Sequence, residues 1–237
     1  LGTHYLSSDP DTAEIIGDVG LFDYAEFCAE YSAFDMSLLY HMARAAQCAD
    51  LPLMIKLDQM NQGFWAQAAI GAGFKAVLFT DIRSPDDVES CYQSIRPDNP
   101  AGQGLMGIKL RRPAFGSYGH DAYLADLESI LFLVMIEKTV AVDNLDMVLE
   151  KAKARGVDMT QWGPADFGFS RGQPDLMDTD EIKPFEELVI RKSIDYGIAP
   201  RIEIRSVDQA QRYMDLGVRH FCVGWDRFIV QSALANI

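Results

Sequence analysis

Eight short β-rich runs alternate along the chain with segments whose apolar residues recur at helical spacing. The predicted strands are residues 2–6, 23–29, 53–57, 76–80, 131–137, 158–162, 201–204 and 220–225. The predicted helices are residues 11–19, 36–49, 64–72, 85–95, 142–154, 180–195 and 207–216. This regular alternation favours an α/β fold, a closed (β/α)8 TIM barrel, over an open sheet.

The length of 237 residues is typical of one barrel, so we expect a single catalytic domain over residues 1–237. Gly73, Gly156 and Gly217 each fall between a predicted helix and the next strand, where a left-handed residue often ends a helix. No GxGxxG follows the first strand, which argues against a dinucleotide-binding fold.

The formal net charge of −14 argues against nucleic acid or an anionic membrane surface as a partner. It leaves room for an anionic small molecule, because a local cation can reverse the field in one pocket. No apolar stretch approaches the ~20 residues of a membrane span, and no secretory signal opens the chain. Four cysteines without CxxC spacing indicate buried thiols in a reducing compartment, so we expect a cytoplasmic protein.

Two segments do not fit a plain barrel. The connection over residues 96–129 is rich in Gly and Pro, and loops of this length are often functional. It contains Arg111 and Arg112, either of which could bind a distal substrate carboxylate or a neighbouring subunit. The last segment, residues 228–237, is an apolar helix with no place inside one barrel, and we expect it to dock on another subunit or on sequence outside this chain.

Two acidic residues come at the ends of apolar strands. Glu137 closes the run from Leu131, and Asp166 follows the next strand after Gly163-Pro164-Ala165. A carboxylate in this position is costly unless it is paired, and the carboxyl ends of barrel strands are where active sites are built. Carboxylates from successive strands suit a hard divalent cation, so the sequence predicts a metal-dependent barrel enzyme.

Other polar side chains follow the remaining strands. They are Glu30, Tyr31, Lys56, Asp58, Thr80, Asp81, Glu203, Arg205, Trp225 and Asp226. Any barrel has polar residues at these positions, so the set alone is weak evidence for a particular reaction. His4 and His120 lack the spacing of metal ligands, and we interpret both as structural or exposed.

Four stretches together resemble one family. They are Leu1-Gly-Thr through Leu21-Phe-Asp23, Val134-Met-Ile-Glu137, Gly156-Val-Asp158 through Gly163-Pro-Ala-Asp166, and Tyr213-Met-Asp-Leu-Gly217 through Val223-Gly-Trp-Asp226. In this order they resemble the HpcH/HpaI aldolases, metal-dependent 2-oxo acid aldolases related to citrate lyase β-subunits. The resemblance implies a (β/α)8 barrel whose last helix is exchanged between subunits of a homo-oligomer, commonly a hexamer or trimer of dimers.

The resemblance also implies roles for single residues. Glu137 and Asp166 match the family's metal ligands, with Mg²⁺, Mn²⁺ or Co²⁺ as the usual ion. Gly163, Pro164 and Ala165 match the loop that binds the pyruvate carboxylate. The implied activity is that of a carbon–carbon lyase that acts on a 2-oxo or 2-hydroxy acid through a metal-bound, pyruvate-type enolate.

The chain departs from the family at the acid/base positions. Cys28-Ala-Glu30-Tyr31 replaces the usual Asp-x-Glu-His, Lys56 replaces an Arg, and Met135 replaces a Gln. Candidate catalytic residues are therefore Tyr31, Glu30 and Lys56, with Lys56 as a charged clamp on the substrate carbonyl rather than a Schiff-base nucleophile. The same site could serve decarboxylation, hydrolysis or another addition, or belong to an inactive 2-oxo acid-binding relative.

Overall fold

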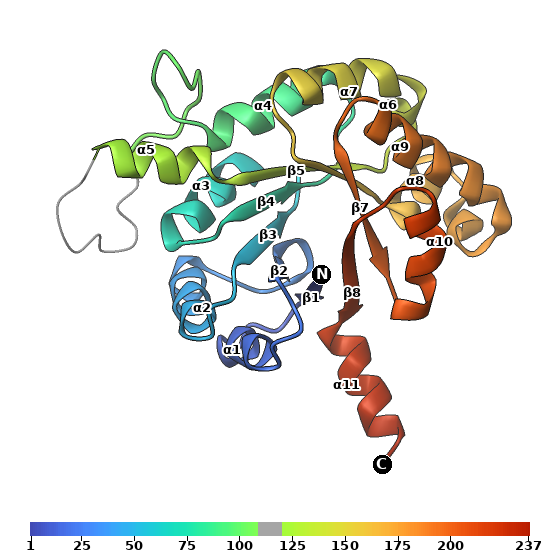
Figure 1. The fold of residues 1–237 in the computed structure, drawn as a ribbon, viewed down its shortest axis with the longest axis horizontal. Helices are drawn as coiled ribbons and strands as arrows, with labels where there is room; N and C mark the ends of the chain where they lie inside the picture. Colours follow the sequence, from blue (N-terminus) through green and yellow to red (C-terminus); the bar gives the residue numbers. More distant parts are fainter. Residues whose placement is uncertain (109–119) are drawn as a thin grey trace.

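Eight parallel strands close into a barrel in the order β1 to β8, with β8 paired back to β1. The computed structural model describes residues 1–108 and 120–237. The strands are β1 (Gly2–Tyr5), β2 (Tyr24–Cys28), β3 (Leu53–Leu57), β4 (Ala76–Phe79), β5 (Leu131–Ile136), β6 (Met159–Trp162), β7 (Ala199–Ile204) and β8 (His220–Trp225). The predicted (β/α)8 barrel is confirmed, with all eight strands where the sequence placed them (Figure 1).

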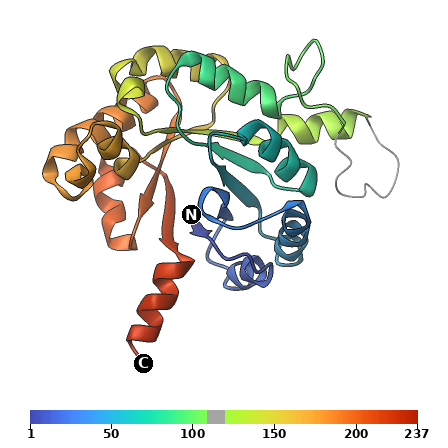
Figure 2. The same cartoon turned by 180° about the vertical axis from the view of Figure 1, so that it is seen from behind.

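Helices surround this barrel on its outer side, as Figures 1 and 2 show. The α-helices are α1 (Asp11–Asp18), α2 (Met36–Cys48), α3 (Gln62–Ala72), α4 (Pro85–Ile95), α5 (His120–Glu128), α6 (Thr139–Asp143), α7 (Leu145–Ala154), α8 (Pro164–Ser170), α9 (Lys183–Asp195), α10 (Ala210–Asp215) and α11 (Asp226–Ala235). Short 3-10 turns are η1 (Ala29–Tyr31), η2 (Pro174–Asp178), η3 (Asp180–Ile182) and η4 (Val207–Gln209).

The helix boundaries follow local signals. Ser84 caps α4 in a reciprocal capping box with Asp87, and Pro85 takes the first turn. Gly73, Gly156 and Gly217 all have positive φ, which confirms the left-handed turns predicted between helix and strand.

Two helices lie in stretches that were interpreted as loops. Helix α5 lies inside the connection interpreted as irregular, and Leu127 is its one buried residue among those described. Helix α8 begins at Pro164, in the stretch interpreted as a substrate-binding loop. Both are short, so the periodic apolar signal is weak, although a proline in the first turn is a normal helix start.

The inside of the barrel is divided in two. Met54, Leu78, Leu133 and Met135 form an apolar cluster on the side of β3 to β5. The side formed by β1, β2, β7 and β8 carries buried polar residues, among them Arg201, which is fully buried. A larger apolar core lies between the strands and the surrounding helices, and each fully buried Leu or Phe there contributes about 1.5–3 kcal/mol.

All four cysteines are free thiols. Cys28, Cys91 and Cys222 are buried as expected, but Cys48 is exposed, because it lies in the last turn of α2 on the side away from the core. Across the described residues, no helix has both the length and the apolar character needed to cross a membrane.

Helix α11 leaves the barrel after β8 and extends away from it (Figures 1 and 2). None of its residues is buried, and Phe228, Ile229, Val230 and Leu234 are each more than half exposed. The expectation of an apolar terminal helix without a place in its own barrel is confirmed. Its exchange between subunits stays a prediction.

Candidate active site at the carboxyl ends of the strands

Glu137 follows β5 directly and is held from both sides. Its side chain is buried, and Oε1 accepts a hydrogen bond of 2.8 Å from the backbone N–H of Asp81, which follows β4. On the other side, a Cβ atom added to Gly163 would lie 2.3 Å from Oε2 of Glu137, so only glycine leaves room for the carboxylate. Neighbouring strand ends therefore fix this carboxylate in one place.

Lys138 lies between two further carboxylates, those of Asp81 and Asp166, at the rim of the barrel that the carboxyl ends of the strands form. Its Nζ lies 2.5 Å from Oδ1 of Asp81 and 2.7 Å from Oδ1 of Asp166, which is in the first turn of α8. Burial alone would lower the pKa of Lys138, but these contacts raise it. Asp166 is thus paired with an ammonium group in this structure, a contact that was not predicted.

The protonation of Glu137 reflects its surroundings. Burial raises the pKa of Glu137 to about 7, and the negative charges of Asp166 and Asp81 add to this increase. The hydrogen bond from Asp81 and the positive charge of Lys56 lower the pKa but do not outweigh burial. The carboxylates of Glu137 and Asp166 therefore share one electrostatic site at one rim. Bringing a cation to this site would relieve the repulsion, and oxygen donors are what hard divalent ions prefer.

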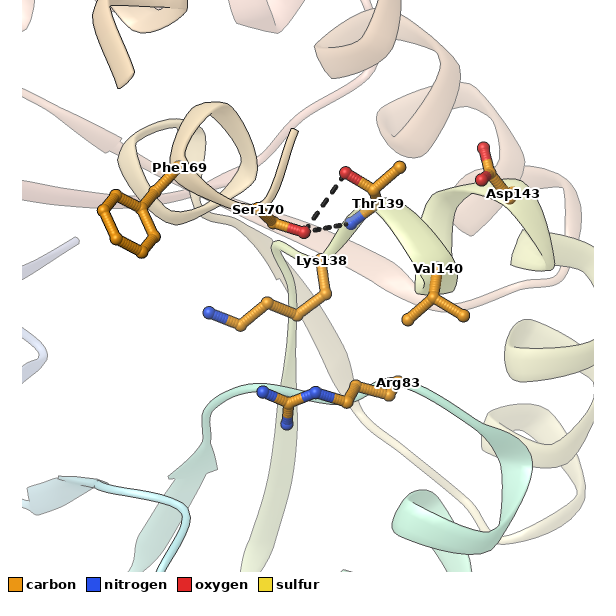
Figure 3. A pocket seen from close by; sticks show the side chains of 7 residues that line it. All are labelled: Arg83, Lys138, Thr139, Val140, Asp143, Phe169 and Ser170. Atoms are coloured by element: carbon orange, nitrogen blue, oxygen red, sulfur yellow. Dashed lines mark hydrogen bonds between the residues drawn. The ribbon is translucent and has the colours of Figure 1, made fainter. Parts of the chain in front are cut away.

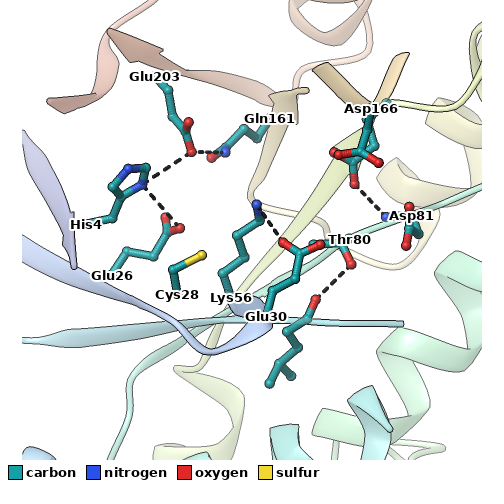
Figure 4. A network of polar contacts seen from close by, with 12 residues as sticks. His4, Glu26, Cys28, Glu30, Lys56, Thr80, Asp81, Gln161, Asp166 and Glu203 are labelled. Carbon is teal, nitrogen blue, oxygen red and sulfur yellow. Dashed lines mark hydrogen bonds and ion pairs between the residues drawn. The ribbon is translucent and has the colours of Figure 1, made fainter. Parts of the chain in front are cut away.

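Lys56 reaches the rim from β3 and is buried. Its Nζ lies 2.9 Å from Oε2 of Glu30, in the turn η1 (Figure 4). The same atom lies 5.0 Å from the centre of the Tyr31 ring. Burial disfavours the charged form, but Cys28, Glu30 and Glu203 raise the pKa of Lys56 well above its ordinary value. The three candidate catalytic residues are therefore together, with Lys56 as a permanent cation.

Tyr31 is half exposed and stacks on Trp225 at 6.1 Å between ring centres. Partial burial raises the pKa of Tyr31, against the nearby charge of Lys56. A phenol with a raised pKa is a poor proton donor at neutral pH, so the structure supplies no activation for Tyr31. Burial also raises the pKa of Cys28, which keeps this thiol protonated.

Gly163, Pro164 and Ala165 differ in what they can offer a carboxylate. The N–H of Gly163 donates to the carbonyl of Ile136, and Pro164 has no N–H. The first N–H groups of a helix have no partner within it, which leaves those of Ala165 and Asp166 for a ligand. The predicted loop is thus a helix start, and Ala165 is the one of the three with a donor to give.

A pocket of about 500 Å³ opens beside this rim (Figure 3). Its lining residues are Arg83, Lys138, Thr139, Val140, Asp143, Phe169 and Ser170. Lys138 belongs both to this pocket and to the carboxylate group of Asp81 and Asp166, so the two spaces adjoin. Arg111 and Arg112 lie outside the described residues, and His120 begins α5.

The comparison with protein families decides the identity. Residues 32–233 match the model of the family HpcH/HpaI aldolase/citrate lyase. The chain belongs to this family. As an HpcH/HpaI aldolase it is an enzyme of the carbon–carbon lyase class, in a family that depends on a divalent metal ion.

Individual proteins also match this HpcH/HpaI family member over nearly its whole chain. A 2-keto-3-deoxy-L-rhamnonate aldolase of Shigella dysenteriae serotype 1 is 27% identical over 237 residues, 99% of this chain and 85% of that protein. A family protein from Burkholderia cenocepacia J2315 superposes with a TM-score of 0.87 at 23% identity and covers 99% of this chain and 91% of that one. The citrate synthase SbnG gives a TM-score of 0.85 at 22% identity, with 99% and 89% covered. These two likenesses to solved structures show the fold.

Sequence reasoning about this HpcH/HpaI aldolase missed three features of the site. Asp81 was noted only as one of many polar residues at strand ends, and Lys138 was not considered. The lysine directly after Glu137 was the available signal, since a long cation at a rim of carboxylates will pair with one of them. The polar interior below the rim was also missed, although His4, Glu26 and Glu203 occupy inward positions on their strands.

Proposed function

We propose that this chain is a divalent-metal-dependent aldolase that cleaves or forms a carbon–carbon bond of a 2-oxo or 2-hydroxy acid through a pyruvate-type enolate. The observation that carries this is the buried carboxylate of Glu137, fixed by Asp81 and Gly163 at the same rim as Asp166. Relatives named 2-keto-3-deoxy-L-rhamnonate aldolase support a hydroxylated 2-oxo acid as the substrate class.

Glu137 and Asp166 would hold the metal ion, which we expect to be Mg²⁺, Mn²⁺ or Co²⁺. Two carboxylates are few ligands, so oxygens of water or substrate complete the shell, as is usual for Mg²⁺. When bound, such an ion acts as a Lewis acid that polarises the 2-oxo group and stabilises the negative charge of an enolate. Lys138 pairs with Oδ1 of Asp166, so its positive charge would oppose a cation bound by the same carboxylate.

The remaining residues bind and orient the substrate. Lys56 supplies a fixed positive charge toward the carbonyl oxygen, and the N–H groups of Ala165 and Asp166 are placed to accept the carboxylate. Arg112 is proposed for a distal carboxylate. The proton carrier is Glu30 or water rather than Tyr31, because the pKa of Tyr31 is raised.

A second function has one observation in its favour. The family's acid/base residues are replaced by Cys28 and Tyr31, and neither is activated here. The same site would then form the enolate but use it in decarboxylation, hydrolysis or another addition.

Proton exchange at the pyruvate methyl group, followed by NMR in D₂O, tests the enolate step. We expect exchange that depends on added Mn²⁺, Mg²⁺ or Co²⁺ and is lost in Glu137→Ala, while Glu150→Ala, an exposed carboxylate on α7, exchanges normally. Turnover with a panel of hydroxyaldehydes then separates the aldolase from non-aldol chemistry. Tight pyruvate binding without exchange would contradict both and favour a binding protein.

We further propose that α11 packs on a neighbouring subunit of a homo-oligomer, a hexamer or a trimer of dimers. Its exposed apolar residues Phe228, Val230 and Leu234 support this. The free thiols of the four cysteines fit a reducing, cytoplasmic location.

A further inference from the structure

A group of buried polar side chains lies inside the barrel, below the rim and apart from the proposed reaction. His4 enters from β1, Glu26 from β2, Glu203 from β7 and Cys222 from β8. His4, Glu26 and Cys222 are 2%, 0% and 1% exposed. Figure 4 shows the ring of His4 between the carboxylates of Glu26 and Glu203.

The distances within this group match a shared ion. Nδ1 of His4 lies 3.5 Å from Oε1 of Glu203 and 3.7 Å from Oε1 of Glu26. One ligand atom each of His4, Glu26 and Cys222 lies within 4.8 Å of the other two. Zinc bond lengths of about 2.0–2.3 Å place tetrahedral ligands about 3.3–3.7 Å apart, so small shifts would bring these atoms onto one ion.

Atoms of two of these residues, His4 and Glu26, lack hydrogen-bond partners. Within residues 1–108 and 120–237, neither ring nitrogen of His4 nor Oε1 of Glu26 makes a hydrogen bond. Buried polar atoms are nearly always partnered, so unpartnered atoms of His4 and Glu26 this close to Cys222 indicate a group that binds among them. The other oxygen of Glu26 is taken by Arg201 at 2.5 Å, and this contact orients the free oxygen.

We propose that His4, Glu26 and Cys222 form a second metal site, a zinc site inside the barrel. A set of imidazole, thiolate and carboxylate donors suits Zn²⁺ and is unsuited to Mg²⁺. The rim site differs, because Glu137 and Asp166 offer oxygen alone.

The position of the site suggests what zinc does there. Its buried ligands come from β1, β2 and β8, and the β1–β8 pairing that closes the barrel has a register shift between Gly2 and His4. An ion at this seam would link the first strands of the chain to the last.

Cobalt spectroscopy on the whole, metal-free chain tests the site, because a thiolate bound to Co²⁺ gives a sulfur-to-metal charge-transfer band in the near ultraviolet. We expect this band in the wild type, in Glu137→Ala and in Cys28→Ser. It should vanish in Cys222→Ser, with circular dichroism to show that this variant is folded. Glu26→Gln should keep the band but need at least about tenfold more Co²⁺ to saturate it, a loss of about 1.4 kcal/mol.

Diffraction from wild-type crystals soaked in Zn²⁺ gives a check that needs no variant. An anomalous peak between His4, Glu26 and Cys222 at the zinc edge supports the site. Absence of both the sulfur band and the peak overturns it and leaves His4 as an imidazolium paired with two carboxylates. Metal-dependent proton exchange at pyruvate tests the rim site and does not depend on that result. The two proposed metal sites are therefore tested by independent experiments.

Discussion

Nζ of Lys138 lies 2.7 Å from Oδ1 of Asp166, so one of the two proposed metal ligands is paired with a cation of the same chain. The ammonium also contacts Asp81, and it is mostly shielded from solvent. A divalent ion that binds Asp166 must compete with this group. Metal affinity is therefore set partly by a residue that is not a ligand.

Replacing Lys138 by Met should tighten Mn²⁺ binding by about tenfold, which corresponds to about 1.4 kcal/mol, because Asp166 no longer loses an ion pair when it takes the metal. Isothermal titration calorimetry measures the change. The control is Lys75→Met, which removes an exposed ion pair with Asp126 before β4, at the other end of the barrel. Weaker binding in Lys138→Met would mean that the lysine positions the carboxylates rather than competing for them.

Glu137 should make the metal-free protein less stable as the pH rises. The folded state raises the pKa of Glu137 from 4.5 to about 7, so between these values the folded protein binds more protons than the unfolded chain. The stabilisation present below pH 4.5 is then lost as the pH rises through 7. Glu137→Gln removes this loss, and Gln can still accept the hydrogen bond from Asp81.

Urea unfolding in the presence of a chelator should therefore show Glu137→Gln to be more stable than the wild type by about 1–3 kcal/mol at pH 8 and equal to it near pH 4.5. Glu150→Gln, an exposed carboxylate, should track the wild type at both values. A Glu137→Gln variant that is less stable at pH 8 would show that Asp81 and Lys56 fully compensate the buried charge.

The barrel could be predicted from the sequence because its signals are local. Strands such as β4 and β5 are uninterrupted apolar runs. The helices between strands begin and end at residues such as Ser84 and Gly73 that favour those positions. Helix α8 could not be separated from a loop, since its seven residues are too few for a periodic pattern.

The site was only partly predictable, for a physical reason. The strand-end positions of Glu137 and Asp166 follow from the chain itself, once the strands are known. Which cation reaches Asp166, or which side chains meet His4 across the barrel, depends on strand stagger and side-chain reach. The position of Lys138 next to Glu137 indicates a cation at the rim but not which carboxylate it contacts, and the position of Cys222 in the sequence does not indicate that it meets His4.

Lys56 should not form a covalent adduct with pyruvate. An amine must be neutral to attack a carbonyl, and Glu30 and Glu203 raise the pKa of Lys56 well above its usual value in spite of burial. Borohydride treatment with pyruvate should leave the intact mass unchanged. Lys56→Arg should keep more activity than Lys56→Met, in which kcat/KM falls by about 10²-fold. A trapped adduct lost in Lys56→Arg would refute the charged clamp.

Helix α11 should hold the oligomer together. Val230 and Leu234 are one turn apart, and they are 56% and 64% exposed in the single chain. Apolar residues in such a row normally pack on a partner, and a carboxylate on each would have to be desolvated in that contact. The double variant Val230→Asp/Leu234→Asp should therefore elute as a smaller species in size-exclusion chromatography with light scattering. Gln231→Asp, which adds a charge at a polar position of the same helix, should keep the wild-type mass. If the double variant keeps the full mass as well, α11 is not the contact that joins the subunits.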